Sequence, residues 1–340
     1  SAASLGMLLR RSCQLRGDGL ALVDDERRLG WKTFADRVAR LAAGLGQIGM
    51  KSGDRVALLS ENSVRFIESY FAVPWGGGVI APINHRLSLA EITEILADCG
   101  AEILIVDRTH AHVIDDIAAR VALRHIVLAS PETPDRRDWT GYEDLIAAED
   151  GNYTWPSFDE NTAASICYTS GTTGNPKGAV YSHRSTVLHA FAAALPDAMS
   201  LKATDTVLPV VPMFHVNAWG LPYTAAMVGC KLVFPGHHLD GASLYNLFEE
   251  EKVTMSAGVP TIWLGLLNHV KSNNLKFSTF KSTVIGGAAC PPAMIRTFEN
   301  DYNVEVIHAW GMTELSPLGT LGRLKAKHAN WSTEDKRSEE

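Results

Sequence analysis

The sequence has few cysteines, and they do not form a pattern that indicates a covalent or metal framework. Five occur in 340 residues, an odd number, and no two make a C-x-x-C pair. Neither a disulfide-rich domain nor a cysteine zinc site is indicated, and a reducing cytoplasm is the expected compartment. Each cysteine stands in an apolar or strand-like context, so we interpret them as small buried hydrophobic residues and not as catalytic thiols. They are Cys13, Cys99, Cys167, Cys230 and Cys290.

The sequence also lacks an excess of positive charge and an uninterrupted membrane-spanning run. Lys and Arg number 31 against 38 Asp and Glu, a net charge of −7. No basic block accumulates, so nucleic-acid binding is not expected. The longest stretch without these charges, residues 206–230, is broken by prolines and is interpreted as buried core and not as a transmembrane helix. At the N-terminus an apolar patch precedes Arg10 and Arg11, the reverse of the signal-peptide order, so secretion is not indicated.

What the sequence does contain is a regular alternation of apolar runs and amphipathic stretches. Hydrophobic residues make up 46% of the chain and charged residues 20%, as in folded globular proteins. The alternation indicates an α/β fold in which helices cover parallel sheets. In the first part we expect strands at 55–59, 79–83, 102–106 and 125–129, and helices at 63–73, 89–97 and 110–119. Ser88 can cap the helix at 89–97, and Gly100 can end it.

The alternation lapses between residues 130 and 161, where prolines, glycines and charges surround one short helix-like piece at 142–148. We therefore expect an α/β subdomain at 1–160, a second one at 161–320 and a polar tail at 321–340. Strands of the second part are expected at 164–168, 206–211, 231–234, 254–257, 283–285 and 304–308, and helices at 182–194, 239–250, 261–270 and 291–299.

The most informative stretch is Tyr-Thr-Ser-Gly-Thr-Thr-Gly-Asn-Pro-Lys-Gly, residues 168–178, directly after an expected strand. Glycines let backbone N–H groups converge on a phosphate, hydroxyls donate further hydrogen bonds, and a lysine adds charge. An ordinary Gly/Ser/Thr turn would not need Lys177 held by Pro176. A Walker A loop is excluded because Pro176 precedes the lysine and Gly178 follows it. The expected phosphate-binding residues are Thr169, Ser170, Gly171, Thr172, Thr173, Gly174 and Lys177.

This stretch resembles, almost letter for letter, the signature of the adenylate-forming superfamily: acyl- and aryl-CoA synthetases, luciferases and peptide-synthetase adenylation domains. The segment Trp310, Gly311, Met312, Thr313 and Glu314 is similar to the family's aromatic-Gly-x-Thr-Glu motif. Its chemistry fits, because an aromatic face can stack on adenine, a hydroxyl can bind the α-phosphate and a carboxylate can bind Mg²⁺. The alternative is a surface carboxylate beside a core tryptophan.

A third segment, Gly286, Gly287, Ala288 and Ala289, resembles the family's adenine-binding turn. The resemblance implies the large N-terminal domain of the adenylate-forming fold, two stacked α/β subdomains with mostly parallel sheets, without the small C-terminal lid. The family's ribose-binding Asp, phosphate-binding Arg and lid Lys cannot be assigned within residues 321–340. The resemblance therefore implies a fragment with impaired turnover.

The resemblance also implies an activity and its cofactors. A fatty acid is activated by ATP to an acyl-adenylate, and CoA then takes the acyl group. Catalysis is expected from Thr169, Lys177, Thr313 and Glu314, with Mg²⁺ on Glu314 and Thr169. Fatty-acyl relatives often form dimers, so a homodimer is compatible with the sequence. Three alternatives stay open: a silent nucleotide- and acyl-binding fragment, another small acid such as an aryl or methylthio-alkanoic acid, and another acceptor such as a carrier protein.

The acid is expected to bind at residues 212–222, an uncharged segment with several aromatic residues. His215 matches a position at the mouth of the family's acyl site, and Trp219 matches an aromatic gate in bacterial medium- and long-chain fatty-acyl-CoA synthetases. No acidic residue between Asp205 and Asp240 could pair with the ammonium group of an amino acid, which favours an aliphatic tail. The adjacent pair His237 and His238 is interpreted as part of a loop and not as a metal site.

Overall fold

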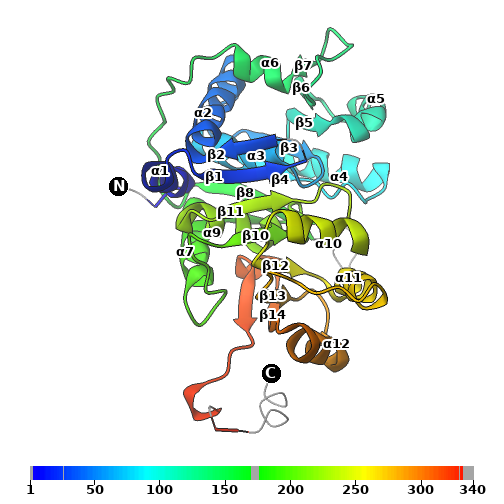
Figure 1. Cartoon of the computed structure of the whole chain (residues 1–340). Coiled ribbons are helices and arrows are strands. Elements are labelled where there is room, and N and C mark those ends of the chain that lie inside the picture. The colour runs from blue at the N-terminus through cyan, green and yellow to red at the C-terminus, as the bar shows by residue number, and fades with distance from the viewer. Residues whose placement is uncertain (1–2, 26, 170–175, 329, 332–340) are drawn as a thin grey trace.

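The computed structural model describes residues 3–25, 27–169, 176–328 and 330–331 (Figure 1). Among these residues, seven strands form one sheet in the order β7-β6-β5-β3-β4-β8-β9. Their bounds are β3 (Arg55–Leu59), β4 (Val79–Pro82), β5 (Ile103–Asp107), β6 (His125–Ala129), β7 (Thr140–Gly141), β8 (Ala163–Thr169) and β9 (Lys177–Ser182). All neighbours pair in parallel except β8 and β9, which are antiparallel.

A second sheet of eight described strands follows the order β15-β14-β13-β12-β10-β11-β1-β2. Its strands are β1 (Leu20–Asp24), β2 (Arg27–Gly30), β10 (Thr206–Pro209), β11 (Lys231–Phe234), β12 (Met255–Gly258), β13 (Ser282–Ile285), β14 (Glu305–Gly311) and β15 (Leu318–Leu321). Only the two edge pairings, β1 with β2 and β14 with β15, are antiparallel. The expected α/β fold with two mostly parallel sheets is confirmed.

Helices cover both sheets (Figure 1). They are α1 (Leu5–Arg16), α2 (Trp31–Gln47), α3 (Val64–Trp75), α4 (Leu89–Cys99), α5 (Ile114–Ala118), α6 (Tyr142–Ala147), α7 (His183–Ala194), α8 (Val216–Trp219), α9 (Leu221–Val228), α10 (Gly241–Glu250), α11 (Pro260–Ser272) and α12 (Pro292–Arg296), with 3₁₀ turns η1 (Arg108–Val113), η3 (Thr313–Leu315) and η4 (Ala326–His328) and a π turn η2 (Thr297–Asp301). Ser88 and Glu91 form a reciprocal capping box on α4, and Gly100 ends it at φ 61°, so both expected helix signals are confirmed.

Several elements differ from the sequence expectation. Nothing was assigned before residue 55, yet α1, β1, β2 and α2 form there. The edge strand β2 escaped notice because Arg27 and Arg28 interrupt its apolar pattern, and Arg28 forms an ion pair with Glu251 outside the strand. The helix expected at 110–119 begins as a 3₁₀ turn at Arg108, and the one expected at 291–299 passes into a π turn.

The two sheets exchange strands across residue 160. Strands β1 and β2 precede that residue but lie in the eight-stranded sheet, whereas β8 and β9 follow it and lie in the seven-stranded sheet. The sheet in which a strand lies does not show which part of the chain folds as a unit. The division into subdomains at 1–160 and 161–320 therefore stays a prediction. Of the expected tail, Leu321 pairs with Ala309 in the β14–β15 ladder, and residues 329 and 332–340 lie outside the described residues.

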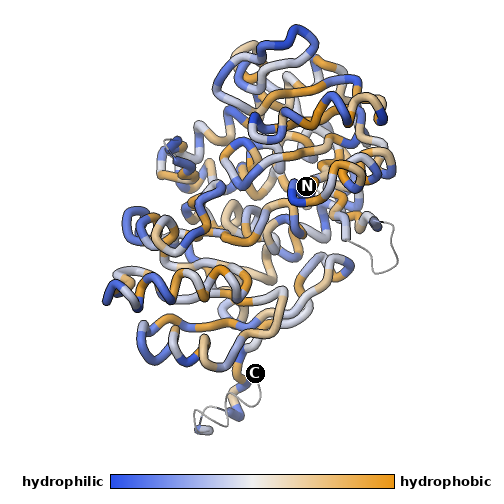
Figure 2. Tube along the Cα trace, turned by 90° about the vertical axis from the view of Figure 1, so that its right-hand side faces the viewer, coloured by the Kyte–Doolittle hydropathy of each residue, from blue (hydrophilic) through white to orange (hydrophobic). Residues whose placement is uncertain are grey.

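The interior is largely apolar, and an ionic network between α2, α3 and α6 is buried within it. The Glu68 carboxylate is fully buried and accepts hydrogen bonds from Arg37, at 2.5 and 3.1 Å, and from the Tyr142 hydroxyl at 2.9 Å. Arg37 also binds Glu143 at 3.0 Å, which links the three helices. Hydrophilic and hydrophobic residues alternate along the outer helices, as expected for helices with one face on a sheet (Figure 2).

The five cysteines are free thiols; four are buried and Cys13 is half-buried. Burial raises the pKa of Cys167 to about 12 and that of Cys290 to about 11, so these two remain protonated at neutral pH. Their interpretation as inert packing residues agrees with this environment. Within the described residues, no helix combines the length and the hydrophobicity needed to cross a bilayer.

Candidate functional site

The strands that flank the Gly/Thr segment form an antiparallel pair. Thr169 ends β8 and lies opposite Lys177, the first residue of β9, and the Thr169 hydroxyl donates to the Lys177 carbonyl oxygen at 3.5 Å. Lys177 is therefore the first residue of an edge strand, whereas the sequence pattern predicted that it lies just beyond a loop. Its side chain is exposed. The predicted phosphate ligands Ser170, Gly171, Thr172, Thr173 and Gly174 lie outside the described residues.

The aromatic motif begins at the end of β14 and continues into η3. The Trp310 side chain is 56% exposed, which leaves an indole face open for stacking. Thr313 is buried, and its carbonyl oxygen accepts a hydrogen bond from the Tyr181 hydroxyl of β9. Glu314 is exposed beside them. Burial, and to a smaller extent the charge of Glu314, raises the pKa of Tyr181, which keeps this phenol protonated as a donor.

Two cavities meet at this motif. The loop-side cavity has a volume of about 200 Å³ and is lined by Pro82, Asn84, Leu87, Glu91, Glu94, Ile95, Tyr168, Thr169, Pro176, Phe214, His215 and Thr313. The indole-side cavity has a volume of about 280 Å³ and is lined by His215, Val216, Trp219, Gly286, Gly287, Ala309, Trp310, Gly311, Met312, Thr313, Pro317 and Leu318. His215 and Thr313 line both, so the two cavities are adjacent.

The turn after β13 needs glycine because another side chain approaches its backbone. A Cβ atom on Gly286 would lie 2.9 Å from the carbonyl oxygen of Ala309 and 3.1 Å from Cη2 of Trp219. Gly287 adopts φ +76°, which an L-residue with a side chain rarely takes. Glycine at 286 therefore gives the indole of Trp219 room to lie against backbone in the wall of the indole-side cavity, and glycine at 287 allows the backbone to turn.

The segment between His215 and Gly220 is a left-handed turn. The backbone angle φ is positive at all four residues of α8, between 42° at Val216 and 56° at Trp219, and at Gly220 it is 73°. Such conformations cost about 1–2 kcal/mol for each residue other than glycine, so the surrounding structure must hold them. Asn217 does so from within the turn, since its amide donates to the Ser165 hydroxyl at 3.1 Å on β8.

His189 supports the same turn from α7. One of its ring nitrogens, Nε2, lies 2.9 Å from the carbonyl oxygen of Trp219. A Cβ atom on Gly220 would lie 2.2 Å from the imidazole ring of His189, so the imidazole occupies the space that a side chain at 220 would need. The strained turn thereby directs both His215, which precedes it, and Trp219, its last residue, to the indole-side cavity.

His215 is neutral at physiological pH because burial lowers its pKa from the ordinary value of 6.5. A neutral imidazole beside an apolar cavity can offer a hydrogen bond without attracting a counter-ion. Its place in both cavities agrees with the expectation that it lies near the acid, but its role remains a prediction.

Most of the described residues that the sequence predicted for the site line one of the two cavities, and three do not. Thr169 lines the loop-side cavity, and His215, Trp219, Gly286, Gly287, Trp310, Gly311, Met312 and Thr313 line the indole-side cavity. Lys177, Ala288 and Glu314 line neither. The pair His237 and His238 lies in an exposed turn after β11, as expected.

Sequence reasoning missed the contribution of the β4–α4 segment to the loop-side cavity, which includes Asn84, Glu91 and Glu94. The signal that could have found it is topological. Strand β4 lies beside β8 and parallel to it. The carboxyl ends of neighbouring parallel strands meet at one edge, where ligands commonly bind.

Comparison with known proteins identifies the family. Residues 9–338 match the family described as "AMP-binding enzyme". The chain is 48% identical over 313 residues to a medium-chain-fatty-acid–CoA ligase of Ectopseudomonas oleovorans, covering 91% of this chain and 57% of that protein. It is 44% identical over 313 residues to a 3-methylmercaptopropionyl-CoA ligase of Ruegeria lacuscaerulensis, covering 91% of this chain and 58% of that protein.

The fold agrees with these sequence matches. The structure superposes on the inhibitor-bound N-terminal domain of FACL13 from Mycobacterium tuberculosis with a TM-score of 0.83 and 29% identity, covering 96% of this chain and 79% of that one. The present chain spans less than three-fifths of the length of the two curated relatives, 57% and 58%. Since the family match covers nearly the whole chain and its signature segments lie around two adjacent cavities, this protein belongs to the AMP-binding enzyme family.

Proposed function

We propose that this chain forms the nucleotide- and acid-binding part of an acid–thiol ligase that activates a fatty acid with ATP and transfers the acyl group to CoA. The observation that carries the proposal is the meeting of the two cavities at His215 and Thr313. One cavity begins at Thr169 beside the Gly/Thr segment, and the other contains the glycine turn and Trp310. A nucleotide and a carboxylic acid bound in these cavities would have their reacting groups close together.

The proposed reaction has two steps. In the first, a carboxylate oxygen of the acid attacks the α-phosphorus of ATP, and the bond to pyrophosphate breaks. In the second, the CoA thiol loses its proton and attacks the acyl carbon, and AMP leaves. Holding the two substrates in reacting geometry, and neutralising charge as it develops, are the contributions expected of the protein.

The residues would divide these tasks by their place in the structure. Thr169 and Lys177, at the two ends of the Gly/Thr segment, would bind the β- and γ-phosphates. The hydroxyl of Thr313 would bind the α-phosphate, and Trp310 would stack on adenine. Glu314 is an exposed carboxylate beside Thr313, and with the hydroxyl of Thr169 it offers the oxygen ligands that Mg²⁺ prefers. Mg²⁺ would supply neutralisation of phosphate charge there.

The acid would bind in the part of the indole-side cavity around His215 and Trp219, beside the adenine, and this cavity favours an acid with an uncharged tail. None of its lining residues is acidic or basic at neutral pH, since His215 is held neutral by burial. A zwitterionic amino acid would bring an ammonium group into this cavity without a partner, which is costly. The named substrates of the two relatives, a medium-chain fatty acid and 3-methylmercaptopropionate, lack such a group. A medium-chain fatty acid is our first choice, and a methylthio-alkanoic acid is the second.

The proposal is tested by measuring pyrophosphate release with Mg²⁺, ATP and a panel of short, medium, long and aryl acids. Glu314→Gln should lower the rate and leave the affinity for an acyl-adenylate analogue nearly unchanged, because this side chain would act on phosphate and metal. Glu102→Gln is the matched control, since that exposed carboxylate forms an ion pair with Arg124 and lines neither cavity. Equal rates for Glu314→Gln and the parent would contradict the role of Glu314.

A second candidate follows from the share of the relatives that this chain spans, 57% and 58%. As it stands, the chain would bind nucleotide and acid but turn over slowly or not at all. Calorimetric binding of ATP or an acyl-adenylate analogue without pyrophosphate release would support this impaired state, and steady release would remove it. Replacing CoA with a loaded carrier protein in a competent assay tests the acceptor.

Two further properties are proposed with the function. The free cysteines agree with residence in the reducing cytoplasm, which fractionation of expressing cells would test. The homodimer compatible with the sequence is tested by sedimentation, where a mass of one chain would reject it.

A further inference from the structure

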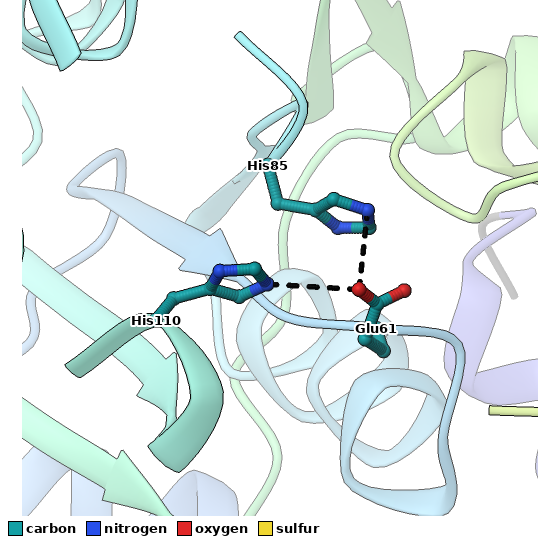
Figure 3. A group of neighbouring side chains, drawn as sticks. All are labelled: Glu61, His85 and His110. Carbon is teal, nitrogen blue, oxygen red and sulfur yellow. Dashed lines mark ion pairs between the residues drawn. The ribbon is translucent and has the colours of Figure 1, made fainter. Parts of the chain in front are cut away.

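Three side chains that the proposed reaction does not use lie together at the carboxyl edge of the seven-stranded sheet. Strands β5, β3 and β4 are adjacent and parallel. Each is followed, within three residues of its end, by a potential metal ligand: His110 after β5, Glu61 after β3 and His85 after β4. Figure 3 shows both imidazole rings pointing to the same oxygen of Glu61.

The spacing of the three ligand atoms fits a small tetrahedral ion. Oε1 of Glu61 lies 3.2 Å from Nε2 of His85 and 3.7 Å from Nε2 of His110. One ligand atom from each residue lies within 4.8 Å of the others. Zinc binds imidazole nitrogen and carboxylate oxygen at about 2.0–2.2 Å, which places neighbouring ligands of a tetrahedron about 3.3–3.5 Å apart. The two distances to Glu61 lie on either side of that range, so small side-chain rotations would complete the geometry.

A cation could bind between the carboxylate of Glu61 and the two ring nitrogens that face it. Nδ1 of His85 lies 3.3 Å from the carbonyl oxygen of Ser60, and because that oxygen only accepts, the proton belongs on Nδ1. In the neutral ring, Nε2 then presents a lone pair to the carboxylate of Glu61. Nε2 of His110 is buried and has no hydrogen-bond partner among the described residues. A cation between the three atoms would accept the Nε2 lone pair of His85 and a lone pair of Glu61, and it would accept that of His110 after displacing any proton on its Nε2.

Asp107 holds two of the three ligand-bearing segments in place. Its Oδ2 accepts from the backbone N–H of Glu61 at 2.9 Å, and its Oδ1 accepts from the backbone N–H of His110 at 3.3 Å. The third segment is held by packing, since the ring of Phe214 meets that of His85 edge-on with centroids 4.9 Å apart. Supporting hydrogen bonds of this kind orient the ligands at metal sites.

We propose that Glu61, His85 and His110 form a binding site for one divalent transition-metal ion, of which Zn²⁺ fits best, with a fourth position open to water. Two imidazoles and one carboxylate suit Zn²⁺ and its neighbours, whereas Mg²⁺ prefers oxygen ligands only. None of the three residues lines either cavity, so this site is separate from the proposed nucleotide and acid sites.

The position suggests what such an ion would do. His85 directly follows Asn84, and Phe214, which packs on His85, precedes His215; Asn84, Phe214 and His215 all line the loop-side cavity. An ion that joins the three segments would therefore stiffen one wall of that cavity. The inferred role is structural: the ion fixes the loops that follow β3, β4 and β5.

The test is metal binding by the chain without ATP or acid, so that its outcome does not depend on the proposed function. Protein stripped with a chelator is titrated with Zn²⁺ against a chromophoric competitor, in an excess of Mg²⁺ to saturate oxygen-only sites. Co²⁺ is then substituted, and its visible absorption reports coordination geometry. We expect one ion per chain, a Co²⁺ spectrum of tetrahedral type, and a melting temperature that rises with the ion.

Variants locate the site. Glu61→Gln keeps the volume of the side chain and His110→Asn keeps a polar side chain, and each should abolish stoichiometric binding. Melting of the metal-free variants shows whether they fold. The double variant His237→Ala/His238→Ala is the matched control, because it removes an exposed pair whose rings lie 3.8 Å apart elsewhere in the chain. Absence of stoichiometric binding, binding that survives His110→Asn, or binding lost in the control would each overturn the proposal.

Discussion

The left-handed turn at α8 should make alanine a worse replacement for Asn217 than glycine, the reverse of the usual order inside proteins. Asn217 is 2% exposed and sits at φ 56°, ψ 43°. Both replacements leave the buried Ser165 hydroxyl without its partner, which costs about 1–3 kcal/mol. Alanine must also hold a left-handed backbone, for about 1–2 kcal/mol more, whereas glycine adopts it freely.

The expected loss of stability is therefore about 2–5 kcal/mol for Asn217→Ala and about 1–2 kcal/mol less for Asn217→Gly. For 340 residues the unfolding entropy is about 0.7 kcal/mol per degree, so Asn217→Ala should lower the melting temperature by about 3–7 °C. Calorimetry or urea unfolding measures this. Asn217→Ala should also weaken the binding of an acyl-adenylate analogue, because the turn positions His215 and Trp219. If the alanine variant equals or exceeds the glycine variant in stability, the left-handed backbone at residue 217 does not carry the expected cost.

Two further predictions concern the cavity wall and the ionic network. Gly286→Ala should weaken binding of the acyl-adenylate analogue and lower the free energy of unfolding by about 1–3 kcal/mol through overpacking. The control Gly265→Ala in α11 should be neutral or stabilising, because nothing lies within 4 Å of the added methyl group. Analogue titration and thermal melting compare the two variants. Burial would raise the pKa of Glu143, but hydrogen bonds from Arg37 and its neighbour Arg27 lower it from 4.5 to about 2. The ionised Glu143 side chain thus stabilises the fold by up to about 3 kcal/mol above about pH 4.5, and this contribution is lost as the pH falls towards 2. In urea unfolding, the free energy of unfolding of Glu143→Gln should therefore fall less steeply with decreasing pH than that of the parent. An equal pH dependence would contradict this role of Glu143.

Sequence patterns predicted the central strands well because these strands are buried on both faces. The expected strand at 55–59 and that at 231–234 match β3 and β11 without any shift. Their apolar runs are bounded by polar residues or, after Phe234, by Pro235, so the pattern has clear ends. Edge elements were missed for the opposite reason, since β2 and β9 carry exposed or charged side chains and have little periodic signal.

The candidate site was predictable only where a motif is local in the sequence. The Gly/Thr segment and the Trp310–Glu314 motif are contiguous and could be recognised by resemblance. The α8 turn could not be predicted, because its left-handed backbone depends on partners such as Ser165 and His189, which are distant in the chain. The cluster of Glu61, His85 and His110 was likewise hidden, since three residues spread over fifty positions become neighbours only when the order β5-β3-β4 is known.

The arrangement of the sheets explains why the site lies where it does. Thr169 and Tyr181 belong to the seven-stranded sheet, while Gly286 and Trp310 follow or end strands of the eight-stranded sheet. The hydrogen bond from Tyr181 to the carbonyl oxygen of Thr313 joins the two sheets at the residue that lines both cavities. A shift of one sheet against the other would therefore change the distance between the phosphate-binding strands and the adenine-binding turn. The relative position of the two sheets is thus itself a determinant of the site, in addition to the residues that line it.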